Sequence, residues 1–177
     1  MQNVLSNSEP YAPSDDTIFF ANYIRNETGN CALDIGTGSG YLAKILLRGF
    51  NFVVASDIAF DSLRKAHSSI DNCICCSGAN GLNTKFDLVV CNLPYLPSEK
   101  IRDTAVDGGK NGVEVGLEII ESVKNMIKKG GKFLFLVSSL TNYQELITKT
   151  QEFGFATKII ERKKIFFEEL ILVEAKK

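Results

Sequence analysis

Short apolar runs alternate with stretches whose apolar residues recur at helical spacing along most of the chain, after a polar segment at residues 1–14. Runs such as Phe-Asp-Leu-Val-Val-Cys at 86–91 are typical of strands that are covered on both faces. Strands are expected at residues 31–35, 52–56, 72–76, 86–91, 133–138, 155–160 and 166–173. Helices are expected at residues 16–26, 41–48, 60–68, 113–128 and 142–153. Gly130 and Gly131 are expected to end the fourth of these helices.

This order of elements predicts an α/β fold, in which a parallel sheet carries helices on both faces. The last two strands have no helix between them, so they should form a hairpin that places an antiparallel strand at one edge. We expect residues 1–177 to form a single domain, with residues 1–29 as an N-terminal arm and helix. In such sheets a ligand binds beyond the carboxyl ends of the strands.

A glycine-rich loop, Asp-Ile-Gly-Thr-Gly-Ser-Gly-Tyr at 34–41, follows the first strand. Its glycines, Gly36, Gly38 and Gly40, let the backbone adopt a positive φ and approach a ligand closely. A dinucleotide site would have a further glycine at position 41, where this chain has tyrosine. Without a diphosphate to hold, the loop can pack against a small zwitterion whose ammonium group faces Asp34.

Asp57 ends the second strand, where a carboxylate can accept two hydrogen bonds from a ribose diol. The glycine loop and this acid together resemble the class I S-adenosylmethionine-dependent methyltransferases. The resemblance implies a three-layer, Rossmann-like fold with a mostly parallel seven-stranded sheet and an antiparallel C-terminal hairpin strand. It also implies that S-adenosyl-L-methionine is the cofactor and S-adenosyl-L-homocysteine the product.

In that family the methionine part of the cofactor lies on the glycine loop and the ribose on the acid after the second strand. The resemblance therefore implies that Asp34, Gly36, Gly38 and Gly40 contact the methionine part and that Asp57 binds the ribose. The adenine usually lies after the third strand, often against an acidic residue. This chain has no acid there, and Ser77 or Asn80 is the expected contact.

The fourth strand ends in the tetrad Asn92-Leu93-Pro94-Tyr95, similar to the (Asn/Asp/Ser)-Pro-Pro-Tyr of enzymes that methylate planar nitrogens. Such a nitrogen shares its lone pair with a π-system and is a poor nucleophile. The Asn92 side-chain oxygen and the Leu93 carbonyl would accept its two N–H bonds and stabilise the developing positive charge. The Tyr95 ring would pack against the planar group. Pro94 stiffens the turn.

The tetrad differs from the family pattern at one position, and one of its residues has a second expected role. Leu93 stands where the family usually has proline, so the turn is expected to be less rigid. Asn92 is also expected to lie against the cofactor.

Two further segments are similar to elements of the HemK/PrmC family, especially its short eukaryotic and archaeal branch. They are Tyr-Ala-Pro-Ser-Asp-Asp-Thr at 11–17 and Gly-Gly-Lys-Asn-Gly at 108–112. The resemblance implies that the arm folds over the cofactor, with Tyr11, Pro13 and Thr17 as contacts. It also implies N5-methylation of the glutamine in the Gly-Gly-Gln motif of a peptide-chain release factor.

Bacterial members of that family carry an additional N-terminal helical domain, which this chain is expected to lack. The short branch works instead with a small zinc-binding activator protein. Residues 70–76 form an apolar edge strand without a protecting lysine or proline, and such an edge invites pairing with another chain. The activator is therefore expected there.

The charge balance bears on the alternative substrates. Lys and Arg number 20 and Asp and Glu 21, a net charge of -1 that excludes a globally basic nucleic-acid binder. An N6-adenine or N2-guanine methyltransferase acting on RNA or DNA remains the alternative, because an exocyclic amine presents the same two N–H groups. A non-catalytic scaffold subunit is a third reading, against which the intact glycine loop, Asp57, Asn92 and Tyr95 argue.

Five cysteines and one histidine complete the candidate chemistry. Cys73 and Cys76 form a single CxxC without a second pair, so no metal site is expected. Neither a signal peptide nor an apolar run of the ~18 residues that span a bilayer is visible. A cytoplasmic protein without a membrane partner is expected.

Overall fold

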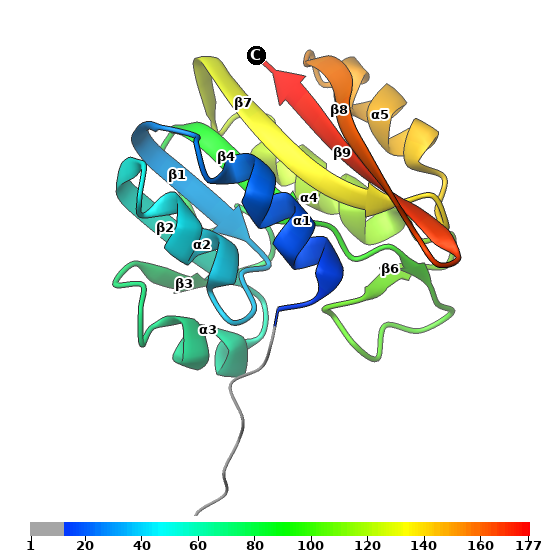
Figure 1. Ribbon diagram of the computed structural model, residues 1–177, viewed down its shortest axis with the longest axis horizontal. Helices are drawn as coiled ribbons and strands as arrows, with labels where there is room; N and C mark the ends of the chain where they lie inside the picture. The colour runs from blue at the N-terminus through cyan, green and yellow to red at the C-terminus, as the bar shows by residue number, and fades with distance from the viewer. Residues whose placement is uncertain (1–12) are drawn as a thin grey trace, which may run out of the picture.

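The computed structural model describes residues 13–177. Seven of its strands form one sheet in the order β3-β2-β1-β4-β7-β9-β8 (Figure 1). The strands are β1 Gly29–Ile35, β2 Phe50–Asp57, β3 Cys73–Cys75, β4 Phe86–Asn92, β7 Ile127–Ser138, β8 Ala156–Ile165 and β9 Glu168–Lys176. The first five of these strands in the spatial order run parallel, and β9 is antiparallel to both β7 and β8. The predicted fold class, a mostly parallel sheet with a C-terminal hairpin, is confirmed.

The position of the antiparallel strand differs from the prediction. β9 lies between β7 and β8, so the edge strand is β8 and not the antiparallel one. The reason is apolarity: residues 170–173 of β9 are buried without interruption, whereas β8 alternates exposed and partly buried positions. A strand that is apolar on both faces belongs inside the sheet.

Helices cover both faces of this sheet, which gives three layers (Figure 1). The helices are α1 Asp15–Ile24, α2 Tyr41–Leu46, α3 Phe60–Ala66, α4 Glu114–Val123 and α5 Tyr143–Glu152. Successive residues of β7 point to opposite faces. Phe133 and Phe135 pack in the cluster that contains α4 and α5, while Leu134 and Leu136 pack in the one that contains α1 and α2.

The start of β7 corrects a prediction. The helix expected to run to residue 128 ends at Val123, and the strand begins at Ile127, which is buried opposite Phe86. Gly130 and Gly131 therefore do not end a helix. They lie in β7, where the register with β4 shifts, and the φ of +79° at Gly130 suits such a bulge. The other expected elements are confirmed with ends shifted by a few residues.

A small two-stranded sheet, β5 Leu96–Pro97 with β6 Asp107–Gly109, lies between β4 and α4, where no strand was expected. It follows the Asn92-Leu93-Pro94-Tyr95 tetrad directly and so helps to place it. None of the described helices is long and apolar enough to cross a membrane. Within residues 13–177, no three His, Cys, Asp or Glu side chains form a group that could hold a metal ion.

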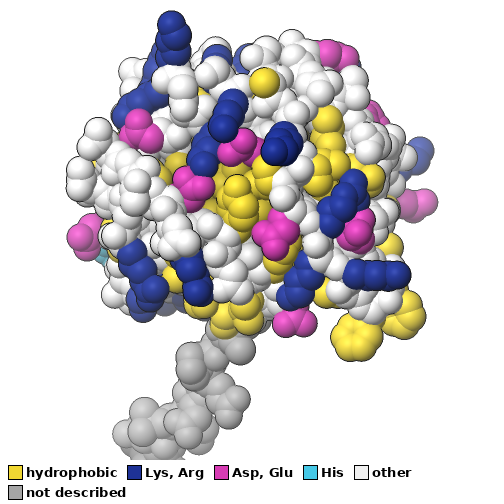
Figure 2. All heavy atoms as spheres, turned by 45° about the horizontal axis from the view of Figure 1, so that its top comes forward, with side chains coloured by type: hydrophobic (Ala, Val, Ile, Leu, Met, Phe, Trp, Pro, Cys, Tyr) yellow, Lys and Arg dark blue, Asp and Glu magenta, His cyan; other side chains and the backbone are white. Residues whose placement is uncertain are grey.

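Charged side chains of both signs are intermixed on the face shown in Figure 2. Among the described residues, Lys132 pairs with Glu27 at 2.6 Å, Lys128 with Asp87 at 2.9 Å, and Arg162 with Glu169 at 2.5 Å. The basic clusters at 128–129 and 162–164 therefore each contribute a residue to an ion pair within the protein itself.

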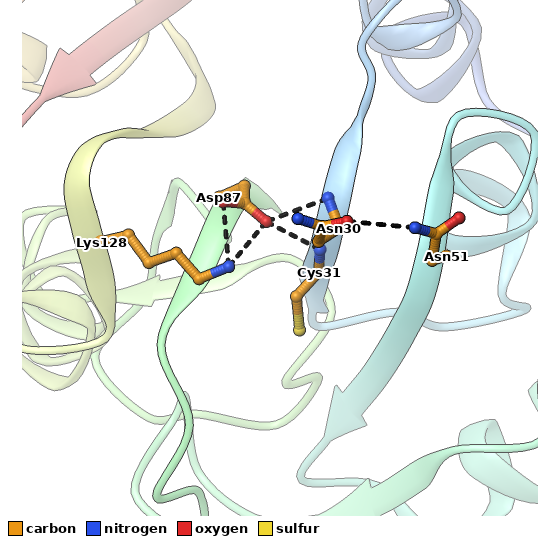
Figure 3. Close-up of polar contacts among 5 residues, drawn as sticks. All are labelled: Asn30, Cys31, Asn51, Asp87 and Lys128. Carbon is orange, nitrogen blue, oxygen red and sulfur yellow. Dashed lines mark hydrogen bonds and ion pairs between the residues drawn. The ribbon is translucent and has the colours of Figure 1, made fainter.

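Asp87 connects three strands at the end of the sheet where β4 begins (Figure 3). Its Oδ2 accepts hydrogen bonds from the backbone N–H groups of Asn30 and Cys31 at 3.1 and 2.8 Å, and Lys128 Nζ lies 2.9 Å away. Burial opposes ionisation here, but Lys128 and the two N–H groups outweigh it and lower the pKa of Asp87. One carboxylate thus holds β1, β4 and β7 together.

Candidate active site

The carboxyl ends of β1, β2, β3 and β4 bring the predicted segments to one edge of the sheet. The Gly38 N–H donates to Asp57 Oδ2 at 2.9 Å, and the Cys76 N–H donates to the Asp57 carbonyl at 3.1 Å. The Ser56 hydroxyl donates to the Gly78 carbonyl at 3.1 Å. The glycine loop, Asp57 and the turn after β3 are therefore joined directly.

The glycine loop has the conformation that only glycine adopts easily. Gly36, Gly38 and Gly40 have φ values of +66°, +54° and +82°. A Cβ at Gly36 or Gly38 would meet no atom of the described residues within 4 Å, so the described part of the protein leaves space beside the backbone there. A Cβ at Gly40 would lie 3.1 Å from the Cβ of Ala66, so this glycine also lets α2 and α3 pack closely. Gly36 and Gly38 form the open cradle.

Asp34 lies below this cradle with only 1 % of its surface exposed. Its Oδ2 accepts hydrogen bonds from Thr37 Oγ1 at 2.7 Å and the Ala43 N–H at 3.0 Å, while its Oδ1 is buried and has no partner within residues 13–177. Burial raises the pKa of Asp34 to about 7, although the two hydrogen bonds oppose the rise. A buried oxygen left unpaired is costly, so the site suits a cationic ligand group.

Asp57 is fixed by two backbone groups. Its Oδ2 accepts from Gly38, as described, and its Oδ1 accepts from the Ala59 N–H at 2.8 Å. A carboxylate oxygen has two lone pairs, so each oxygen can accept a further bond from a hydroxyl. This geometry fits a diol beside the glycine cradle.

The turn after β3 is less informative about a ligand. Ser77 and Asn80 are both exposed, and the Asn80 N–H donates to the Ser77 carbonyl at 3.2 Å. Ser122 of α4 holds the turn through the Ala79 N–H at 3.0 Å. The contact of Ser77 or Asn80 with an adenine stays a prediction.

Asn92 is the polar residue at the end of β4. Its Nδ2 donates to Asp16 Oδ2 at 2.9 Å, and its Oδ1 is buried without a hydrogen-bond partner among residues 13–177. An amide oxygen in this state still has its capacity to accept an N–H group. Asp16 belongs to α1, so the N-terminal helix closes against the tetrad.

Leu93 fixes this turn through both its backbone and its side chain. Its N–H donates to the Leu136 carbonyl at 3.0 Å, and its side chain is 2 % exposed in the core cluster that contains α4. A proline would offer neither the donor nor the same side chain. The turn that was expected to be looser is therefore anchored on β7.

The segment at 108–112 packs closely against the backbone of the tetrad. A Cβ at Gly108 would lie 2.7 Å from the Pro94 carbonyl oxygen, and one at Gly112 would lie 2.5 Å from the Tyr95 carbonyl oxygen. Both positions therefore require glycine so that the two backbones can approach. This contact explains why a glycine-rich segment accompanies the tetrad.

Tyr95 is half-buried, and burial raises its pKa to about 12, with Glu168 and Asp16 adding to the rise. The phenol is therefore neutral at physiological pH. Glu168, at the start of β9, also accepts a hydrogen bond from Ser138. Glu168 could not be found from the sequence, because nothing there links β9 to the tetrad.

The N-terminal residues are placed only in part. Thr17 lies in the first turn of α1, where its N–H donates to Asp16 Oδ1 at 2.6 Å, and Pro13 precedes the helix. Tyr11 lies outside the described residues. The contact of these three residues with a cofactor stays a prediction.

The sequence matches the methyltransferase small domain over residues 14–167. A curated relative from Methanocaldococcus jannaschii, called a putative protein N5-glutamine methyltransferase, is 33% identical over 180 residues and covers 94% of this chain and 91% of its own length. A release factor glutamine methyltransferase from Bradyrhizobium diazoefficiens is 29% identical over 122 residues, with 57% of this chain and 41% of the relative covered.

Solved structures agree with this match. A chain from the E. cuniculi Mtq2-Trm112 complex, described as responsible for methylation of the eRF1 translation termination factor, has a TM-score of 0.80 at 25% identity, covering 94% of this chain and 98% of that one. The N-methyltransferase NodS from Bradyrhizobium japonicum, in complex with S-adenosyl-L-homocysteine, shares the fold at a TM-score of 0.65 and 16% identity, with 97% and 93% covered. The protein described here belongs to the methyltransferase small domain family.

Proposed function

We propose that this protein transfers a methyl group from S-adenosyl-L-methionine to N5 of the glutamine in the Gly-Gly-Gln motif of a peptide-chain release factor. The observation that carries the proposal is the buried Oδ1 of Asn92 at the end of β4, which no described residue pairs with. The names of the curated relatives support the choice of glutamine, and the E. cuniculi complex supports a translation termination factor as substrate. Such an enzyme would act in the cytoplasm.

The residues at the glycine loop fit the proposed cofactor. When bound, S-adenosyl-L-methionine supplies a methyl group on a sulfonium centre. The unpaired Oδ1 of Asp34 would pair with its ammonium group, and the open backbone at Gly36 and Gly38 would receive the methionine part. The oxygens of Asp57 would accept the two ribose hydroxyls.

The tetrad would hold the acceptor amide. Asn92 Oδ1 and the Leu93 carbonyl would each accept one N–H bond, which orients the nitrogen and stabilises the positive charge that develops on it. The neutral Tyr95 ring would pack against the planar group. The nitrogen can release its proton to water after transfer, so no side chain has to act as a strong base.

We also propose a small partner protein at β3. This strand is one edge of the sheet, and Cys75 on it, with Ile58 and Phe60 nearby, is exposed. The E. cuniculi neighbour was solved in a complex with a second protein, Trm112. A zinc-binding activator on residues 70–76 would cover these apolar side chains.

The test is mass spectrometry of a recombinant release factor after incubation with this protein and S-adenosyl-L-methionine, with and without the partner. We expect one added methyl group on the Gly-Gly-Gln glutamine. Asn92→Ala should lower the rate about 100-fold or more, since one preorganised contact to the reacting group is lost. The matched control is Asn125→Ala, which changes an exposed asparagine away from the tetrad.

Two outcomes would contradict the proposal. Methylation of tRNA or DNA, with none on the release factor, would favour the exocyclic-amine alternative. Absence of S-adenosyl-L-homocysteine binding in calorimetry would favour the scaffold alternative. The face in Figure 2 carries charges of both signs, which argues against a nucleic-acid surface there. The ion pairs of Lys128 and Arg162 also leave these two basic side chains less available for phosphate groups.

A further inference from the structure

The side chain of Asn92 has two different ends, and only its oxygen can accept an N–H bond from an acceptor amide. The structure turns Nδ2 towards Asp16 Oδ2, 2.9 Å away, and leaves Oδ1 buried, with no partner in the part of the chain that the structure describes. Asp16 lies on α1 and Asn92 at the end of β4, so this contact joins two distant parts of the chain.

The carboxylate determines this orientation. If the amide turned over, Oδ1 would face a carboxylate oxygen, and two acceptors without a proton between them repel. In the observed orientation the same pair forms a charge-assisted hydrogen bond, which is among the stronger kinds. Asp16 therefore favours the one orientation of Asn92 in which the oxygen is free.

Asp16 is itself held in place. Its Oδ1 accepts the Thr17 N–H at 2.6 Å and the Ser14 hydroxyl, which leaves Oδ2 for Asn92. The helix that carries it is fixed in the core through Phe20 and Ile24, both fully or almost fully buried. The carboxylate thus rests on a rigid element.

We infer that Asp16 is a positioning residue for methyl transfer: it orients the Asn92 amide so that Oδ1 accepts the N–H of the acceptor. The inference rests on the proposed function. A negative charge on the Nδ2 side also polarises the amide and strengthens Oδ1 as an acceptor. Asp16 acts through Asn92 and does not touch the acceptor.

The kinetic test compares Asp16→Leu with Asp15→Leu on the recombinant release factor. Asp15 is an exposed neighbour in the same first turn, so its replacement removes the same charge from the same helix end. We expect kcat to fall about 10- to 100-fold in Asp16→Leu, with little change in Asp15→Leu. Affinity for S-adenosyl-L-homocysteine should stay within about twofold of wild type in both variants. Asp16→Asn, whose side-chain oxygen can still accept from Nδ2, should recover part of kcat.

The second readout does not depend on activity. In ¹⁵N-labelled protein, the side-chain NH₂ signals of Asn92 are assigned by their loss in Asn92→Asp. One of the two Nδ2 protons of Asn92 is hydrogen-bonded to Asp16. We expect the NMR signal of this proton to be shifted downfield in wild type and in Asp15→Leu, and to lose this shift in Asp16→Leu. Asp16→Asn has almost the same shape and should change the same chemical shift in the same direction by a smaller amount. This variant replaces Asp16→Leu in the test if Asp16→Leu does not fold.

Unchanged Asn92 signals in Asp16→Leu would overturn the inference, whether kcat falls or not, because Asp16 would then not orient the amide. An equal loss of kcat in Asp15→Leu would overturn it as well. If the wild-type protein methylates no glutamine, the proposed function fails, while the amide signals still decide whether Asp16 orients Asn92.

Discussion

At the scale of single residues, the buried carboxyl of Asp34 at the candidate site is expected to destabilise the free protein. Its pKa of about 7 in the folded state lies above the ordinary value of 3.8. The folded protein therefore binds more protons than the unfolded one between these two values. The stability of the free protein should fall as pH rises through this window, by up to about 4 kcal/mol.

The same group predicts how ligand affinity depends on pH. Asp34 must be ionised to pair with an ammonium group, so affinity for S-adenosyl-L-homocysteine should rise about tenfold from pH 6 to pH 8. Calorimetry at several pH values measures this. In Asp34→Asn the affinity should be lower and its rise with pH should be lost. An affinity that falls with rising pH in the wild-type protein would contradict the prediction.

Leu93 supports a second prediction at this scale. Leu93→Pro restores the residue that the family usually has, yet it removes a hydrogen bond to Leu136 and a buried side chain. We expect the free energy of unfolding to fall by at least about 2 kcal/mol, measured by urea denaturation. Leu93→Met, which conserves volume, is the control and should cost less than about 1.5 kcal/mol. A Leu93→Pro variant as stable as wild type would show that the turn repacks.

At the scale of elements, the bonds of Asp87 to β1 and β7 predict a stability effect. Asp87→Ala should lower the free energy of unfolding by about 1–3 kcal/mol at pH 7, because two backbone N–H groups and Lys128 lose their partner. The exposed neighbour Lys129→Ala is the control.

The pH dependence of that effect has a definite sign. The folded pKa of Asp87 lies below its ordinary value, so its contribution is present above pH 4 and is lost as pH falls through the folded pKa. Urea denaturation at pH 7 and pH 3 should show the difference between wild type and Asp87→Ala shrink in acid. A difference that grows in acid would mean that the ion pair is not the cause.

Most elements could be predicted from the sequence because buried parallel strands leave continuous apolar runs. The junction of α4 and β7 could not, since Lys128-Lys129-Gly130-Gly131 interrupts the strand pattern with residues that usually mark a turn. Pairing of Ile127 with Phe86 overrides that local signal. The small sheet β5–β6 was missed because two or three residues carry no periodicity.

At the scale of the whole molecule, the sequence could predict only those candidate site residues that lie within a recognisable local motif. The glycine loop, Asp57 and Asn92 are of this kind. Asp16 and Glu168 reach the tetrad only through tertiary packing of α1 and β9, and no local pattern marks such contacts. Burial of Leu93 could not be read from the sequence for the same reason.

The tip of the β8–β9 hairpin gives a prediction about association. Phe166 and Phe167 are both 96% exposed, so they contribute little to the fold. The double variant Phe166→Ser/Phe167→Ser should leave the free energy of unfolding within about 0.5 kcal/mol of wild type. Static light scattering should show less self-association at high concentration, because an exposed aromatic pair is removed. A clear loss of stability would show that the hairpin tip packs against the protein.

The place of β9 also bears on how the protein is made. Both neighbours of this strand, β7 and β8, precede it along the chain. Until β9 emerges from the ribosome, these neighbours keep unpaired backbone groups on the edges that will receive it, and such edges attract other chains. Closure of the sheet therefore has to wait until β9 has been synthesised. A nascent chain stopped before Glu168 would present both of these edges unpaired and should be prone to associate with other chains.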